Sequence, residues 1–413
     1  MSLPVDLSDA LLQIRAAADR LKPHIRTTPT VYSYTFSEVL GSDVYLKLEN
    51  LQRTGSFKVR GALNRILTLP AEARAKGLIA ASAGNHAQGV ALAASLAGCS
   101  SKIVMPISTA LMKVDRTRKY GAEVVLFGNN YDEAAAHAAE LAQSEGRTPV
   151  HPFDEWEIIH GQGTVGIEIA EQVPDVGSVI LPIGGGGLIA GVALAMKALR
   201  PEVSIIGVQA EGASPMVQSI QEGEKRVVDA PRTLAEGIRV GKVGDLTFEV
   251  VRQLVDRTVT VTEDEIAAGV VELMEKNKVV AEAAAVTPIA AMLAGKVRCR
   301  ETLCGVISGG NIDLSMMGRL IEFGLARRGQ LVSICLRMDD EPGSLRRMLK
   351  IVESERANVQ DVRHDRSGWK VPVGSVEVEV LVETRGSEIG AQIIDKLRDE
   401  GFEVLDSPST TAH

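Results

Sequence analysis

The chain alternates short apolar runs with longer helical stretches, and this order restricts the possible fold more than any other feature. The runs are VYLKL (44–48), LIAAS (78–82), KIVMP (102–106), EVVLF (123–127), SVILPI (178–183), SIIGVQ (204–209) and TLCGVIS (302–308). Most of them are continuously apolar, as strands covered by helices on both faces must be. Helix starts lie between them, such as the capping-box pair Thr262 and Glu265 before a periodic run to Asn277. We therefore predict an open parallel α/β sheet.

Residues 328–413 follow a different pattern, which begins at a polar RRGQ linker (327–330). The segment LVSICLRM alternates between apolar and polar residues, as expected of a strand with one buried face. The predicted order is strand 331–338, turn 340–343, helix 344–355, strands 358–364 and 375–383, helix 387–400 and strand 402–406. This βαββαβ order predicts a separate C-terminal domain with an antiparallel sheet, after a first domain at 1–327.

Charge and composition narrow the function classes. The 413 residues carry a formal net charge of −8, which disfavours nucleic acid as a partner. No run approaches the ~18 apolar residues of a membrane span, and no signal-peptide pattern opens the chain. The cysteines form no C-x-x-C pair, so neither a zinc site nor a disulfide framework is indicated; they are Cys99, Cys299, Cys304 and Cys335. We expect a cytoplasmic protein without a membrane partner.

Two motifs carry polar residues at expected helix starts. GSFKVRGALN (55–64) places Lys58 where a positive charge opposes the helix dipole, although a lysine whose stem lies along the surface is the commoner explanation. SAGNHAQG (82–89) would expose backbone N–H groups to a carboxylate, and a capping role for Asn85 explains it equally well. A lone histidine such as His86 more often supports its turn by hydrogen bonding.

Two glycine-rich motifs follow buried strands. LPIGGGGLIAG (181–191) lets the backbone approach an anion at a helix N-terminus, and we expect a phosphate monoester there. It is neither G-x-G-x-x-G nor a P-loop. SGGN (308–311) ends another strand. Ligands of open α/β sheets bind outside the carboxyl ends of the strands, so these motifs should meet in one crevice.

Taken together, the motifs resemble those of fold-type II pyridoxal-phosphate enzymes, which share the tryptophan-synthase-β fold. The sequence is most similar to the threonine dehydratase (threonine ammonia-lyase) family. The similarity rests on KLENLQRTGSFKVRGA, SAGNHAQGVA, HPFDEWEIIHGQGT, GGGGLIAG, TLAEGIRV and SGGN, and covers residues 20 to 325 or so. It implies an open parallel sheet in two subdomains, the smaller inserted at about 50–155. The C-terminal unit, with DEPGSL at 340–345, resembles a ferredoxin-like ACT regulatory domain.

The resemblance also implies roles for individual residues. Lys58 would bind pyridoxal 5'-phosphate as a Schiff base and later remove the substrate Cα proton. The implied cofactor-binding residues are Lys58, Phe57, Asn85, Gly184, Gly185, Gly186, Gly187, Leu188, Gly237, Glu282 and Ser308. The implied substrate-carboxylate residues are Ser82, Gly84 and His86. A neutral Ser308 hydroxyl at the ring nitrogen would make the ring a weaker electron sink and favour loss of the β-hydroxyl.

The implied reaction converts L-threonine to 2-oxobutanoate and ammonia, and L-serine to pyruvate as a side activity. At three places the sequence departs from the family pattern, and these places limit what the resemblance implies. Ala83 stands where racemases carry a second serine, which disfavours racemisation. Gln209 and Pro215 replace carboxylates of cation-dependent relatives, which leaves a metal site undetermined. Glu282 lies in AEAAAV rather than in the usual Gly- or Pro-containing version.

Several alternatives use nearly the same residues. A serine dehydratase, a 3-hydroxyaspartate ammonia-lyase or a β-replacing synthase would differ only in the side-chain pocket. A cofactor-less amino-acid sensor is a further possibility, against which Lys58 and the four glycines argue. We expect a homo-oligomer, dimer or tetramer, in which ACT-like units pair by their sheet edges. An amino-acid effector, isoleucine first, would then bind near Asp340, Gly343 and Asn358.

Overall fold

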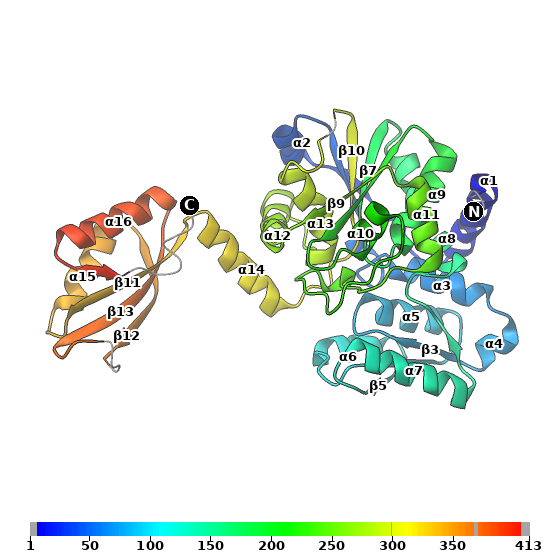
Figure 1. The fold of residues 1–413 in the computed structure, drawn as a ribbon, viewed down its shortest axis with the longest axis horizontal. Helices are drawn as coiled ribbons and strands as arrows, with labels where there is room; N and C mark the ends of the chain where they lie inside the picture. The colour runs from blue at the N-terminus through cyan, green and yellow to red at the C-terminus, as the bar shows by residue number, and fades with distance from the viewer. Residues whose placement is uncertain (1–5, 299, 367–370, 406–413) are drawn as a thin grey trace. The chain divides into compact units, whose positions relative to one another are not determined.

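The computed structural model describes residues 6–298, 300–366 and 371–405. The chain forms two compact units, Met1–Ile312 and Asp313–His413 (Figure 1). Cys299 and Asp406, the last residue of the final predicted strand, lie outside the described residues.

The larger sheet of the first unit has six strands. They are β1 (Thr30–Tyr32), β2 (Val44–Leu48), β7 (Val176–Pro182), β8 (Ser204–Ala210), β9 (Arg257–Val261) and β10 (Thr302–Ile307). Their order is β1-β2-β10-β7-β8-β9, and every neighbouring pair is parallel except β1 and β2. Strands β10 and β7 therefore lie in the middle of the sheet, and their carboxyl ends are adjacent.

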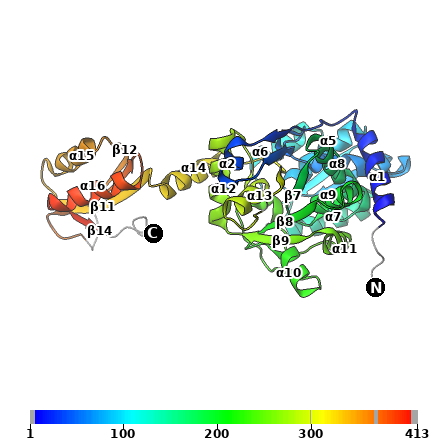
Figure 2. The ribbon, with the colours of Figure 1, turned by 90° about the horizontal axis from the view of Figure 1, so that it is seen from above.

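Helices cover both faces of this sheet (Figure 2). The helices are α1 (Leu7–Leu21), α2 (Tyr34–Leu40), α8 (Trp156–Gln172), α9 (Gly187–Leu199), α10 (Pro215–Glu222), α11 (Asp245–Leu254), α12 (Glu263–Asn277) and α13 (Ala283–Leu293), with short 3-10 turns η1 (Glu49–Leu51) and η2 (Glu236–Ile238). On one face α9 packs on β7 and is flanked by α1, α8 and α11. On the other, α13 packs across β7, β8, β9 and β10, with α12 beside it. A buried, mostly aliphatic core lies under α9.

The smaller sheet of the first unit is parallel throughout. Its strands are β3 (Leu78–Ala81), β4 (Ser101–Met105), β5 (Glu123–Leu126) and β6 (Thr148–Pro149), in the order β5-β4-β3-β6. Its helices are α3 (Lys58–Thr68), α4 (Ala71–Ala75), α5 (Asn85–Leu96), α6 (Leu111–Lys119) and α7 (Tyr131–Glu145). Helix α3 contacts both α5 and α8, so it joins the two sheets of this unit.

The second unit is a four-stranded antiparallel sheet with two helices against it and one leading into it. Its elements are α14 (Leu314–Arg327), β11 (Leu331–Asp339), α15 (Ser344–Ser354), β12 (Asn358–Asp365), β13 (Ser375–Glu383), α16 (Ser387–Asp399) and β14 (Glu403–Leu405). The strand order is β12-β13-β11-β14. Every second residue of β13 is a buried valine, so the sheet buries one face against α15 and α16.

The predicted fold class is confirmed. All seven predicted strands of the first unit form, with ends shifted by two residues at most, and the second unit has the βαββαβ order. The capping box forms as predicted, because Thr262 and Glu265 bond to each other's main-chain N–H groups. Strands β1, β6 and β9 were not predicted: β1 and β6 are very short, and the edge strand β9 alternates Thr with Val instead of being continuously apolar.

The domain limits stay a prediction. In the structure α14 belongs to the second unit, because it contacts β11, whereas the sequence patterns place the boundary after Arg327. The inserted subdomain at about 50–155 stays a prediction as well. None of the described helices combines the length and apolar character needed to cross a bilayer.

Candidate active site

Lys58 begins α3, and its amine is partly enclosed. Nζ donates a hydrogen bond to the Pro152 carbonyl at 2.9 Å and lies 5.3 Å from the centre of the Phe57 ring. Burial lowers the pKa of Lys58 to about 8, and the nearby Glu282 carboxylate acts in the opposite direction. A sizeable neutral fraction therefore exists at neutral pH, and only the neutral amine can act as nucleophile or base.

The segment before Lys58 lies against the carboxyl end of β10. Ser56 and Gly309 form an antiparallel bridge, and the Phe57 N–H donates to the Ser308 carbonyl at 3.1 Å. Ser308 is only 3% exposed. The structure thus brings the lysine motif and the SGGN motif to one strand end, although they are far apart in the sequence.

The four glycines Gly184–Gly187 connect β7 to α9 and are closely surrounded. A Cβ on Gly185 would overlap the Phe153 ring, and a Cβ on Gly186 would lie 2.8 Å from the Cβ of Thr247. Gly186 also has a φ of 98°, in the left-handed region that favours glycine. The loop conformation therefore depends on the absence of side chains.

Main-chain N–H groups of this loop lack an acceptor in the part of the chain that the structure describes. Among the described residues, none of the N–H groups of Gly184, Gly185 and Gly186 donates a hydrogen bond to the chain. The N-cap of α9 likewise has no side-chain hydrogen bond, and Leu188 lies in its first turn, where helical N–H groups lack an internal partner. Consecutive free N–H groups at a helix N-terminus form an anion site.

Asn85, at the start of α5, belongs to a polar cluster. Its Nδ2 donates to Glu282 Oε1 at 2.6 Å, and its Oδ1 accepts a hydrogen bond from Asn311 Nδ2 at 2.7 Å. Burial raises the pKa of Glu282 to about 7, although the Asn85 hydrogen bond acts against this. Gly237 borders the cluster, because a Cβ there would lie 3.2 Å from Glu282 Oε1.

The substrate-loop residues follow β3. Ser82 Oγ accepts a hydrogen bond from the Gly84 N–H at 3.2 Å, and the space beside Gly84 is open, since an added Cβ would meet nothing within 4 Å. His86 is buried, and its Nε2 lies 3.0 Å from the Val150 carbonyl, to which it must donate. Burial lowers the pKa of His86 to about 3, so the ring is neutral at neutral pH. The His86 ring thus links the start of α5 to the residue after β6.

The three residues expected at a regulatory site lie in the second unit. Asp340 forms a salt bridge with Arg366 at 3.0 Å, which holds the pKa of this carboxyl below its usual value. Gly343 has a φ of 102° as the N-cap of α15. Asn358 Nδ2 lies 3.4 Å from Glu383 Oε2. In the part of the chain that the structure describes, no group of three His, Cys, Asp or Glu side chains is arranged to hold a metal ion.

Sequence reasoning assigned no role to four residues that shape this region. Asn311 holds Asn85, Phe153 packs against the glycine loop, and Asp154 and Thr247 bond to the elements around it. Asn311 is the last residue of the SGGN motif, and Phe153 and Asp154 lie in the HPFDEWEIIHGQGT motif. Thr247 lies inside a helix and carries no sequence signal.

These groups fit pyridoxal phosphate. The free N–H groups of Gly184–Gly186 suit its phosphate, and the Lys58 amine suits covalent attachment to its aldehyde. The buried Ser308, beside the bridge that precedes Lys58, is available for the polar end of the ring.

The chain belongs to the family of pyridoxal-phosphate-dependent enzymes, whose family model matches residues 21–309. Within that family it is similar to an L-threonine ammonia-lyase of Geobacter sulfurreducens, with 46% identity over 391 residues, 94% of this chain and 97% of the relative. A catabolic L-threonine dehydratase of Escherichia coli is 45% identical over 327 residues, 78% of this chain and 99% of the relative. The processed form of threonine deaminase isoform 2 from Solanum lycopersicum has a similar structure, with a TM-score of 0.73 and 39% identity over 77% of this chain and 93% of that chain.

Proposed function

We propose that this protein is a threonine ammonia-lyase, which converts L-threonine to 2-oxobutanoate and ammonia and acts on L-serine as a side activity. The observation that carries the proposal is the position of the Lys58 amine. It bonds to Pro152, next to Phe153, whose ring packs on the glycine loop with its free N–H groups. The names of the relatives indicate threonine as the amino acid.

The chain's own residues account for the binding steps. The N–H groups of Gly184–Gly187 and Leu188 would bind the phosphate, and Phe57 and Gly237 would border the ring. Asn85, which donates a hydrogen bond to Glu282, would bond to the ring hydroxyl. Ser308 would offer a neutral hydroxyl to the ring nitrogen.

Proton transfer then depends on Lys58. When bound, pyridoxal phosphate withdraws electrons from the substrate Cα and so makes its proton acidic. The substrate carboxylate binds at Ser82, Gly84 and His86, where main-chain N–H groups at the start of α5 favour an anion. The Lys58 amine, with its lowered pKa, would remove the Cα proton as a general base, and the β-hydroxyl would take up one proton and leave as water. The released enamine then reacts with water to give 2-oxobutanoate and ammonia.

The second unit is proposed as a regulatory domain. Its βαββαβ sheet has two edge strands, β12 and β14, either of which can pair with a second copy of the chain. A branched-chain amino acid, isoleucine first, binds near Asp340, Gly343 and Asn358 in this proposal and changes the response to threonine. The proposal includes a homo-oligomer and a reducing, cytosolic environment, which the free Cys99, Cys304 and Cys335 suit.

The test is ketoacid formation by the purified protein from L-threonine, L-serine and 3-hydroxyaspartate. We expect 2-oxobutanoate from threonine at the highest kcat/KM. We also expect no turnover by Lys58→Ala and normal turnover by Lys76→Ala, a change at an exposed lysine after α4. Oxaloacetate as the main product would instead favour a 3-hydroxyaspartate ammonia-lyase, and turnover by Lys58→Ala would refute the role of Lys58.

A further inference from the structure

Two buried side chains from other elements donate hydrogen bonds to carbonyl groups in and just before the glycine loop. Thr247, in the first turn of α11, donates its Oγ1 hydrogen to the Gly185 carbonyl at 2.7 Å. Gln209, near the end of β8, donates from Nε2 to the Ile183 carbonyl at 3.3 Å. Both side chains belong to residues with no exposed surface.

A hydrogen bond to a carbonyl also orients the next N–H group. In a trans peptide the C=O and the following N–H point in opposite directions within one plane. The Gly185 carbonyl therefore fixes the Gly186 N–H, and the Ile183 carbonyl fixes the Gly184 N–H. Both of these N–H groups are among those that donate to no acceptor within the described residues.

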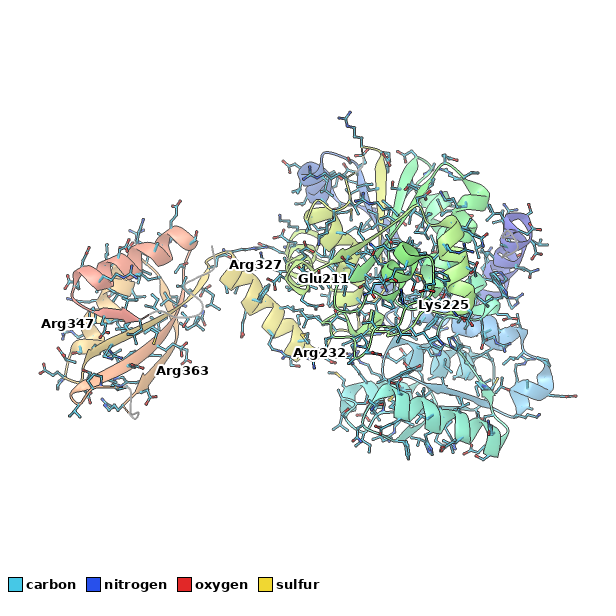
Figure 3. The ribbon with its side chains drawn as sticks, viewed as in Figure 1. Glu211, Lys225, Arg232, Arg327, Arg347 and Arg363 are labelled. Atoms are coloured by element: carbon cyan, nitrogen blue, oxygen red, sulfur yellow. The ribbon has the colours of Figure 1, made fainter. Side chains whose placement is uncertain are left out.

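Thr247 is itself held in place. The Asp154 carboxylate accepts hydrogen bonds from three consecutive N–H groups of α11, those of Asp245 at 2.9 Å, Leu246 at 3.0 Å and Thr247 at 3.1 Å. It replaces the missing cap of a helix whose N-cap is Gly244. Lys225, which is labelled in Figure 3, forms a salt bridge with Asp245.

Gln209 is fixed in a similar way. Its Oε1 accepts a hydrogen bond from the Val217 N–H, in α10, at 2.9 Å. The amide therefore bridges α10 and the first peptide of the loop, and both of its polar atoms are bonded. The Thr247 hydroxyl and the Gln209 amide, from two different elements, thus each bond to one peptide of the loop. One further peptide lies between these two.

We propose that Thr247 and Gln209 are positioning residues for the phosphate site. By holding the outward carbonyls, they keep the N–H groups of Gly184 and Gly186 directed at the phosphate before it binds. Such preorganisation increases affinity for the phosphate without a direct contact. The proposal rests on the assignment of Gly184–Gly187 as the phosphate site.

The test compares two ligands of the apoprotein, pyridoxal 5'-phosphate and pyridoxal, which differ only in the phosphate. For Thr247→Val, which keeps the shape but removes the hydroxyl, we expect about a tenfold weaker Kd for pyridoxal 5'-phosphate and an unchanged Kd for pyridoxal. Thr247→Ser should restore the phosphate preference. Gln209→Met should reduce it in the same way as Thr247→Val.

The matched control is Thr117→Val. Thr117 is 1% exposed and its hydroxyl bonds to a main-chain carbonyl, that of Lys113, at 2.9 Å, but it lies in α6. It should leave both Kd values unchanged. Thermal unfolding of each apoprotein shows whether a variant is folded at the temperature of the titration.

The outcomes distinguish a failure of the positioning role from a failure of the phosphate-site assignment. A wild-type protein that binds the two ligands equally would refute the phosphate site itself. A wild type that prefers the phosphate, together with a Thr247→Val variant that keeps the full preference or weakens both ligands alike, would refute the positioning role alone.

Discussion

The Lys58 amine is reactive because burial destabilises its charged form, and no strong negative charge nearby compensates for this. Its hydrogen-bond partner is a neutral carbonyl, that of Pro152, and the charge that acts on it is Glu282. Burial therefore determines the direction of the pKa shift. This balance can be tested by pH, since only the neutral amine reacts with an aldehyde.

The rate at which the apoprotein attaches pyridoxal phosphate should rise with pH and level off above about 8, the pKa of Lys58. Below that value the rate should fall about tenfold per pH unit, because the neutral fraction does. Stopped-flow absorbance at a series of pH values measures it. A rate that still rises steeply toward pH 10, as with Nα-acetyl-lysine in solution, would show that the amine is not buried.

Glu282→Gln provides a second measurement on the same amine. Glu282 has a pKa of about 7, so it carries negative charge where Lys58 titrates and raises the Lys58 pKa. The amide keeps an acceptor for Asn85 but removes that charge. The midpoint of the attachment profile should therefore move to lower pH, and a shift to higher pH would contradict the interaction.

Ala83 should make racemisation slow. The methyl group between Ser82 and Gly84 has no proton to deliver to the second face of the substrate. Because a positioned acid contributes about 10²–10⁴-fold, D-serine should form from L-serine at least about a hundredfold more slowly than pyruvate. Ala83→Ser should raise the D-serine rate. Comparable rates of both products in the wild type, followed by chiral chromatography, would refute the prediction.

Helix α3, which presents Lys58, is anchored by a buried group of charges. Arg60 donates to Glu49 at 2.7 Å and 2.8 Å and to Glu168 at 2.6 Å, and Lys47 donates to Glu168 at 2.6 Å. Arg60, Glu49 and Lys47 have no exposed surface. These ion pairs connect α3 to β2, η1 and α8. Removing one charged side chain should strongly destabilise the fold, because its partners would stay charged, buried and unpaired.

Arg60→Ala should lower the free energy of unfolding by about 3–5 kcal/mol, measured by urea denaturation. The matched control is Arg65→Ala on the same helix, whose salt bridge to Glu155 is 22% and 24% exposed. That change should cost about 1 kcal/mol or less. Equal losses for the two variants would show that the buried ions do not anchor α3.

How much could be predicted differs between elements and side chains. The buried strands were predictable because both of their faces are covered, which leaves continuous apolar runs such as SVILPI. The edge strand β9 was not, since RTVTV is half exposed and polar at alternate positions. Motifs at strand ends indicated the site, but the bonds of Asn85 to Glu282 and of Thr247 to Gly185 join residues whose proximity arises only from the tertiary fold.

The two units of the chain suggest separate roles, catalysis in the first and effector binding in the second, and kinetics can test this. All the residues proposed for catalysis lie in the first unit, and the proposed effector residues lie in the second. Allosteric coupling of about 1–3 kcal/mol corresponds to about a 5- to 150-fold change in affinity.

Isoleucine should therefore shift the threonine saturation curve of the full chain, and a chain ending at Arg327 should keep its turnover but lose the shift. Steady-state kinetics of both forms, with valine and serine as further effectors, measure this. An unchanged isoleucine response in the shortened chain would refute the regulatory role of the second unit.

The central claim is that Lys58 holds the cofactor covalently, and borohydride reduction tests it most directly. Reduction converts the bond between lysine and cofactor to a stable amine, and peptide mass spectrometry then locates it. The account predicts a phosphopyridoxyl group on the peptide containing Lys58 and on no other lysine. Modification of a different lysine, or none in a protein that turns over threonine, would contradict it.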